Sequence, residues 1–170
     1  MTRLPPLAFT RSREFRRRPF PHTTVSEAEW SALAHILGRG DVTLLSLWGE
    51  DGAICMALHD PAARGVAVAR VAAVRGRFPS VGRHHPPAQR LERVVADLFG
   101  LVPAGAGDRR KWLDHGRWGV VHPLGEAAAG RGASDYAFAP VEGESLHQVP
   151  VGPVHAGIIE PGHFRFTAQG

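Results

Sequence analysis

The sequence predicts an α+β fold: a small domain with helices on one face of a three- or four-stranded sheet, followed by an extended linker and an incomplete β-rich second module. Two segments have the one-face spacing of an amphipathic helix, and several short runs of β-type residues lie between them. β-type residues then return only near the end of the chain. With 170 residues, 44% of them apolar, the chain suffices for one ordinary hydrophobic core.

The first predicted helix covers residues 27–37. Ser26 and Glu29 form a capping box at its start, and Gly38 can end it. The apolar residues between them recur at one-face helical spacing: Trp30, Leu33, Ala34 and Leu37.

The sheet is predicted from three runs of β-type residues. Residues 42–48 and 53–58 are separated by a turn sequence at residues 49–52, which together predict a hairpin. A third strand is expected at residues 66–75.

The second predicted helix is the clearest element in the sequence. Pro86 and Pro87 can open it, and Gly100 ends it. One apolar stripe is expected to pack on the sheet: Leu91, Val94, Val95 and Leu98. The charged residues of the helix are expected to face away from the sheet: Arg90, Arg93 and Asp97.

Residues 102–134 are rich in Gly, Ala and Arg. A loop of this length is expected either to be functional or to wrap a partner. It contains Trp112 and Trp118, which need burial somewhere.

The positive charge of the chain is concentrated at its N-terminus. The net charge is +4, whereas residues 1–18 alone carry six Arg and one Glu, or +5, which leaves −1 for residues 19–170. The predicted folded part is therefore nearly neutral, and we expect no nucleic acid among its partners. A stand-alone basic protein that binds nucleic acid or an anionic membrane surface through residues 1–18 is the alternative interpretation.

The sequence contains no signal for export or for an independent enzyme of a common class. No apolar run approaches the roughly 18 residues of a spanning helix, and the basic N-terminus lacks the apolar core of a secretory signal. The lone Cys55 suggests a reducing compartment. We therefore expect a cytoplasmic location. Zinc-site, P-loop, dinucleotide-binding and nucleophile-elbow patterns are absent, and no self-contained metal site is expected.

Two stretches resemble a known family. Residues 151–166 resemble the first strand-loop-strand of the catalytic large subunit of formate-hydrogenlyase-type nickel-iron hydrogenases, and Gly152-Pro153-x-His155 is similar to the opening of the quinone-site subunit of complex I. Residues 86–100, with Asp108-Arg109-Arg110, resemble the complex I subunit that is fused ahead of that catalytic domain in many such hydrogenases. His122-Pro123-Leu124 resembles the linker between the two modules. The chain thus resembles the N-terminal part of the large subunit of a membrane-bound, energy-converting hydrogenase.

This resemblance implies a division of the chain into four parts. Residues 1–25 are expected to be a basic flexible tail, residues 26–101 a domain like the complex I C subunit, and residues 102–145 a linker or wrapping segment. Residues 146–170 are expected to be the truncated start of a D-type catalytic domain.

The implied function is that of a peripheral-arm assembly module in a hydrogenase or NADH–quinone oxidoreductase-like electron-transfer complex. The isolated chain is expected to be inactive, although it belongs to an oxidoreductase. Its partners are then the other subunits, through which it is held at the inner membrane face. No cofactor is expected in this chain, because the two Cys-x-x-Cys pairs that hold nickel in the family are absent from it. The nickel-iron site and the iron-sulfur clusters are expected on the missing portion or on partner subunits.

Three residues are candidate catalytic residues by the same resemblance. Glu160, followed by His163, resembles the glutamate that passes protons to and from the metal site, and a buried carboxylate suits that role. Its alternative interpretation is an exposed turn acid. His155 matches the histidine that reaches the quinone headgroup in complex I, and it is interpreted here as a proton-path, loop-ordering or purely structural residue.

Overall fold

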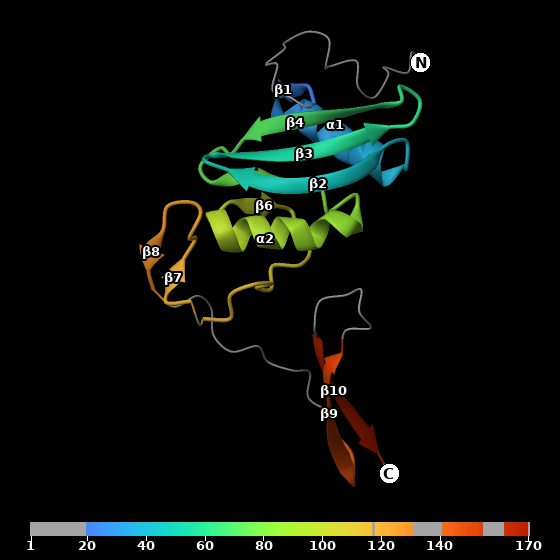
Figure 1. The fold of residues 1–170 in the computed structure, drawn as a ribbon, viewed down its shortest axis with the longest axis vertical. Helices are drawn as coiled ribbons and strands as arrows, with labels where there is room; N and C mark the ends of the chain where they lie inside the picture. The colour runs from blue at the N-terminus through green and yellow to red at the C-terminus, as the bar shows by residue number, and fades with distance from the viewer. Residues whose placement is uncertain (1–19, 117, 131–140, 155–161, 170) are drawn as a thin grey trace. The chain divides into compact units, whose positions relative to one another are not determined.

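The computed structural model describes residues 20–116, 118–130, 141–154 and 162–169 (Figure 1). The chain divides into two compact units, Met1–Asp135 and Tyr136–Gly170. Among the described residues, the first unit holds two α-helices and a four-stranded sheet, and the second holds a two-stranded hairpin. The predicted α+β class is therefore confirmed.

The main sheet has the strand order β1-β4-β3-β2. Strands β2 (Thr43–Glu50), β3 (Ala53–Asp60) and β4 (Gly65–Ala72) form an antiparallel meander, and β1 (His22–Thr24) pairs in parallel with the other side of β4. The predicted hairpin is thus present. Its turn contains Gly52 with a φ of 63°, a conformation that glycine adopts without strain.

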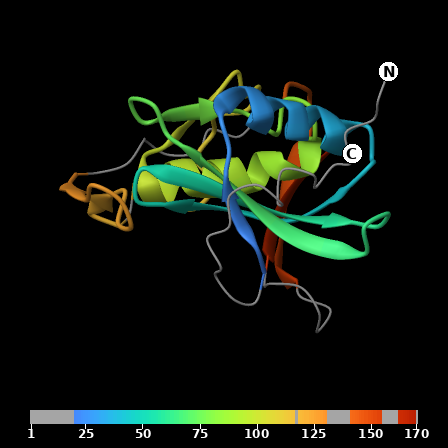
Figure 2. The ribbon, with the colours of Figure 1, turned by 90° about the horizontal axis from the view of Figure 1, so that it is seen from above.

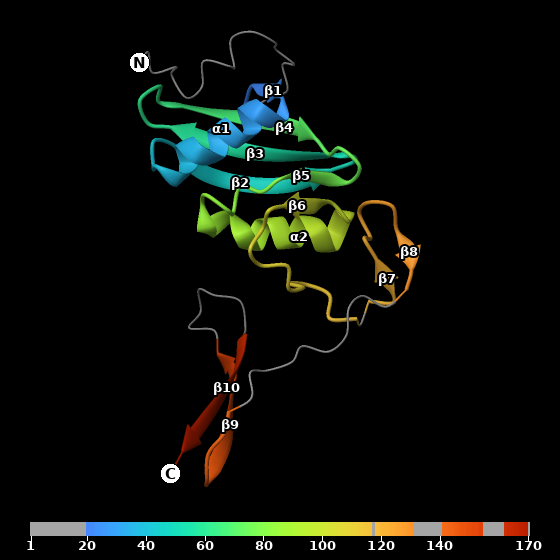
Figure 3. The same ribbon diagram turned by 180° about the vertical axis from the view of Figure 1, so that it is seen from behind.

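Helix α1 (Glu27–Gly38) covers one face of this sheet, behind the strands in Figure 1 and in front of them in Figure 3. The predicted capping box is present, because the Ser26 N–H donates to Glu29 at 2.7 Å and the Glu29 N–H donates to the Ser26 hydroxyl at 3.3 Å. All four predicted apolar positions are buried: Trp30, Leu33, Ala34 and Leu37. They form one core with the inward residues of β3, which are Ile54, Met56 and Leu58.

Helix α2 (Gln89–Phe99) packs against β2 on the same side of the sheet as α1 (Figure 2). A single 3-10 turn, η2 (Pro86–Ala88), leads into it, and Gly100 ends it in the left-handed conformation with a φ of 73°. Gly49 of β2 allows a close approach, since a Cβ at this position would lie 2.5 Å from the Phe99 ring.

The burial of α2 corrects one prediction from the sequence. Val95 is 1% exposed and belongs to the core, and Leu91 packs against that core while partly exposed. Arg93 and Asp97 were expected to face away from the sheet, on the polar side of an amphipathic helix, yet they are only 8% and 5% exposed, so this charged side is buried. The reason is tertiary: residues 108–113, which we call the covering loop, lie over the charged side of the helix.

Four short strands and one longer pair complete the described structure. Strands β5 (Arg77–Pro79) and β6 (Val102–Ala104) pair in parallel, and β7 (Val120–Val121) and β8 (Ala128–Ala129) form a small antiparallel ribbon. In the second unit, β9 (Leu146–Val154) and β10 (Gly162–Gln169) form an antiparallel hairpin. None of the helices in the described ranges has the length and apolar character needed to cross a membrane.

Candidate functional site

Glu92 is a carboxylate in the interior of the first unit, 1% exposed. It accepts hydrogen bonds from the Val81 N–H at 2.5 Å, the Gly82 N–H at 3.1 Å and the Ser80 hydroxyl at 2.9 Å. Burial raises the pKa of Glu92, and these hydrogen bonds act in the opposite direction. The Glu92 carboxylate therefore attaches the turn that follows β5 to helix α2.

Gly82 belongs to the same turn and makes this close approach possible. A Cβ at this position would lie 2.8 Å from both Glu92 Oε2 and the Gln89 side chain. A larger residue at position 82 would clash with α2 and displace the turn from the helix.

The Arg93 side chain holds the covering loop through backbone carbonyl groups of that loop. Its guanidinium donates to the carbonyl oxygens of Arg110 at 2.6 Å and Lys111 at 2.8 Å, and to Asp108 at 3.2 Å. A planar guanidinium can serve several acceptors at once in fixed geometry, which Lys could not reproduce.

Asp97 holds the next part of the covering loop, one helical turn further along α2. It accepts from the Trp112 and Leu113 N–H groups, both at 2.8 Å, and from the Lys111 ammonium group at 3.1 Å. Together, Asp97 and Arg93 provide hydrogen-bond partners for the backbone N–H and carbonyl groups of a segment that forms no regular secondary structure.

Asp108 forms hydrogen bonds within the covering loop and also to α2. Its carboxylate accepts from the Arg110 N–H and from the Arg110 guanidinium, at 3.0 and 2.7 Å, and also pairs with Arg93. Hydrogen bonds from the Arg110 side chain and backbone hold the pKa of Asp108 well below its usual range.

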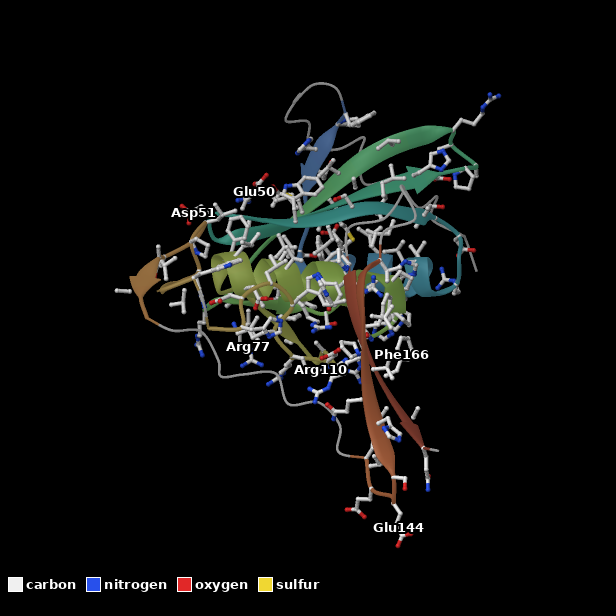
Figure 4. The ribbon with its side chains drawn as sticks, turned by 60° about the horizontal axis from the view of Figure 1, so that its bottom comes forward. Glu50, Asp51, Arg77, Arg110, Glu144 and Phe166 are labelled. Carbon is white, nitrogen blue, oxygen red and sulfur yellow. The ribbon has the colours of Figure 1, made fainter. Side chains whose placement is uncertain are left out.

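These contacts fix the backbone of the covering loop at Trp112, whose side chain is partly exposed. The Trp112 ring lies under the guanidinium groups of Arg90 and Arg93, at 5.1 and 4.9 Å from the ring centroid, yet 41% of the residue is exposed. Leu113 beside it is 38% exposed. Figure 4 shows Arg110 projecting from the loop under α2. Arg and Trp on an ordered surface are typical of protein–protein contact sites.

All of these residues lie inside the segment 23–134, which matches the family model described as respiratory-chain NADH dehydrogenase, 30 Kd subunit. The chain belongs to this family. Since the match covers most of the first unit, the network on α2 is part of the 30 kDa subunit domain.

Two proteins of Escherichia coli (strain K12) are similar to part of this chain. Hydrogenase-4 component G is 36% identical over 107 residues, which cover 55% of this chain and 18% of that protein. Formate hydrogenlyase subunit 5 is 34% identical over 110 residues, which cover 59% of this chain and 19% of that protein. The chain thus matches only about a fifth of the length of these relatives.

A solved trypsin-resistant fragment of Nqo5 is also similar to the chain. The likeness covers 52% of this chain and 81% of the fragment, with 24% sequence identity and a TM-score of 0.45.

The segment with the His122-Pro123-Leu124 motif closes the C-terminal end of α2 in this domain. The Leu124 N–H donates to the Leu98 carbonyl at 2.9 Å, and His122 lies so close to Gly100 that a Cβ there would meet its ring at 2.7 Å. A cavity of about 460 Å³ next to it is lined by His122, Arg75 and the acidic residues Glu50, Asp51 and Glu126. Figure 4 marks Glu50 and Asp51 at this end of the sheet.

The second unit presents an apolar face formed by residues that alternate along both strands. Val149 pairs with Phe166 and Val151 with Phe164, so all four side chains lie on one face of the hairpin. They are 45, 54, 38 and 50% exposed in that order, and the two Phe rings lie 6.0 Å apart.

Of the three candidate catalytic residues, Glu160 and His155 lie outside the described residues. His163 lies in β10 and is exposed, with its ring against Gly152. The basic segment 1–18 also lies outside the described residues. Within the described ranges, no group of three or more His, Cys, Asp or Glu side chains could hold a metal ion.

The sequence did not indicate that residues on α2 support the surface around Trp112. Arg93 and Asp97 are spaced by one helical turn, a signal that they share a side of the helix. Their partners are separated from them by 15 to 18 positions along the chain, and nothing in local periodicity links the two segments.

Proposed function

We propose that this chain is the peripheral-arm assembly module of a hydrogenase or NADH–quinone oxidoreductase-like complex, and that it binds neighbouring subunits rather than performing chemistry. The observation that carries this proposal is that three charged residues of α2 form hydrogen bonds within the chain. Glu92, Arg93 and Asp97 are all engaged by groups of their own chain and therefore shape a surface. That surface exposes Trp112 and Leu113, which suits protein contact.

Within this class we propose a membrane-bound, energy-converting nickel-iron hydrogenase of the formate-hydrogenlyase type. Both curated relatives carry hydrogenase or formate hydrogenlyase names. The apolar face of the β9–β10 hairpin supports the same assignment, because an isolated two-stranded hairpin is marginal in water and needs cover on such a face. We propose that the hairpin begins a catalytic domain whose remainder supplies this cover.

The chemistry of the complex is then assigned to other parts of the assembly. Nickel and iron-sulfur centres need several soft thiolate ligands, whereas Cys55 is the single cysteine of this chain and is 0% exposed. Electrons and protons would move through partner subunits, at the inner membrane face. Glu160 and His155 are proposed to act in proton transfer only where the remainder of the catalytic domain encloses them.

Co-purification tests the function. The full chain, tagged and expressed in its own host, should recover nickel-iron hydrogenase subunits in a stoichiometric complex. Phe166→Asp should reduce that recovery at least about tenfold, because a carboxylate in an apolar interface is costly to desolvate. Thr167→Asp is the matched control, since this neighbouring exposed residue points to the opposite face of the hairpin.

Two results would contradict the proposal. Recovery of the chain alone, or of the chain with bound nucleic acid, would favour a stand-alone role for it. Equal loss of the complex with Phe166→Asp and Thr167→Asp would mean that the apolar face is not the contact.

A further inference from the structure

A groove with a volume of about 570 Å³ lies between the η2 turn and the covering loop. Pro86, Pro87, Arg90, Arg110 and Trp112 are among the residues that line it. We propose that this groove binds an acidic segment of a neighbouring protein subunit, with Trp112 as the apolar anchor and Arg90 and Arg110 as contacts for its carboxylates. The proposal rests on the assembly function and names the chemistry of the partner at the same surface.

The anchor is held in place before any partner arrives. Asp97 fixes the Trp112 and Leu113 N–H groups, and Arg93, itself 8% exposed, ties the preceding carbonyl oxygens to α2. The indole ring is further held against two guanidinium groups. A large side chain that is ordered and still 41% exposed loses little conformational freedom on binding, which favours its use as a contact residue.

The charge of the groove selects an acidic partner. Its lining residues include three guanidinium groups and one carboxylate, which is a net charge of plus two. That carboxylate, Asp108, already receives hydrogen bonds from Arg93 and Arg110. Arg90 is exposed on the first turn of α2, and the Arg110 side chain is 64% exposed. Carboxylates of a partner would thus meet accessible positive charge from Arg90 and Arg110 in the groove that Trp112 also lines.

A protein segment fits this groove better than nucleic acid. Residues 19–170 carry a net charge of −1, so the positive charge here is a local feature and not part of a long basic path. A phosphate backbone needs such a path, and single strands need a series of aromatic side chains for stacking. A groove lined by a single Trp, exposed arginines and two Pro residues suits a short peptide.

Peptide binding to the full chain tests the groove directly. Overlapping fifteen-residue peptides that cover the hydrogenase and NADH-dehydrogenase subunits of the host are arrayed and probed with the labelled chain, and the peptides that bind are titrated by fluorescence anisotropy. We expect the binders to be acidic. Arg90→Glu and Trp112→Ala should each weaken them at least about tenfold.

Arg77→Glu is the matched control, because Arg77 is an exposed arginine on β5 outside the groove (Figure 4). It should change the affinity less than twofold. Circular dichroism checks that all three variants keep the fold. A second arm replaces the peptides by an oligothymidine of the same length in nucleotides.

The outcomes separate this proposal from the assembly function. No peptide binding, binding that is indifferent to peptide charge, or an equal effect of Arg77→Glu and Arg90→Glu would overturn the groove proposal even where the hydrogenase subunits co-purify. Tighter binding of the oligothymidine through Arg90 and Trp112 would overturn it in favour of nucleic acid. Acidic peptide binding without co-purification would leave the groove standing and remove the assembly function.

Discussion

At the scale of single residues, Glu92 shows how one buried carboxylate can organise two elements. Its helix alone gives no reason for a charged residue at this position, which lies beside the core residue Val95. The reason lies in Val81 and Gly82, whose N–H groups point into the interior and need an acceptor.

Glu92→Ala is therefore expected to lower the free energy of unfolding by about 2–4 kcal/mol, because two buried N–H groups lose their acceptor. Glu92→Gln keeps one acceptor oxygen for both groups and should cost less than about 1 kcal/mol. Chemical denaturation of the two variants measures the difference. Equal losses would mean that charge, and not the acceptor oxygen, is what the turn requires.

Asp108 predicts a pH dependence of stability. Its pKa is lower in the folded chain than in the unfolded one, so its stabilising contribution is complete above an unfolded pKa of about 3.9 and is lost as the pH falls below it. Asp108→Asn should thus be less stable than the parent at neutral pH, and the gap should close in acid. Glu92, whose raised pKa gives the opposite slope, is present in both proteins and cancels from the comparison. Denaturation at a series of pH values checks this, and a gap that stays constant would rule out the ionised pair.

At the scale of elements, α2 is buried on two sides for two different reasons. Its apolar side, with Val95 and partly Leu91, packs on the core by the hydrophobic effect. Its charged side is covered because Arg93 and Asp97 supply partners to the backbone of the covering loop. The helix is thus a support for that loop as well as a layer of the domain.

Asp97→Asn should release the covering loop while leaving the helix in place. An amide keeps one acceptor oxygen but loses the negative charge that strengthens its bonds to the two N–H groups and to Lys111. Hydrogen exchange at Trp112 and Leu113 should become at least about tenfold faster, with little change in α1. Arg77→Gln, at an exposed position on β5 that makes no contact with the covering loop in the hydrogen bonds described above, is the control and should leave that exchange nearly unchanged. Faster exchange throughout the domain would instead mean global destabilisation.

At the scale of the whole molecule, the two units differ in how they satisfy their apolar residues. The first unit buries large side chains such as Trp30, Phe78 and Met56 completely. The hairpin of the second unit exposes Val149, Val151, Phe164 and Phe166. A partner is therefore more important to the stability of the second unit than to that of the first.

Hydrogen exchange on the dilute chain should accordingly show strong protection in β3 and little in β9 and β10, because local opening is easy where few apolar side chains are buried. Protection of the hairpin should increase in the assembled complex, or with concentration if chains pair through this face. Strong protection of β9 and β10 in the dilute monomer would contradict the view that the hairpin lacks its cover.

The purified chain is expected to contain no stoichiometric nickel or iron, because soft thiolate ligands are what a nickel-iron site requires and Cys55 is the only thiol. Elemental analysis of the chain measures this, with the assembled complex as the comparison. One equivalent of nickel bound to the isolated chain would contradict the assignment of the metal to other parts of the complex.

The sequence by itself determined the elements whose signals are local. The capping box and apolar spacing predict α1, the turn around Gly52 predicts the hairpin, and the Pro-Pro pair with Gly100 delimits the second helix, because each depends on residues within a few positions of one another. Only the tertiary structure decided that β1 joins β4 and that Arg93 and Asp97 are buried. Those features depend on partners far away in the chain, such as Ala69 for β1 and Trp112 for Asp97. The periodicity of one helix cannot indicate which distant backbone groups need a charged side chain, so the surface around Trp112 became visible only in the fold.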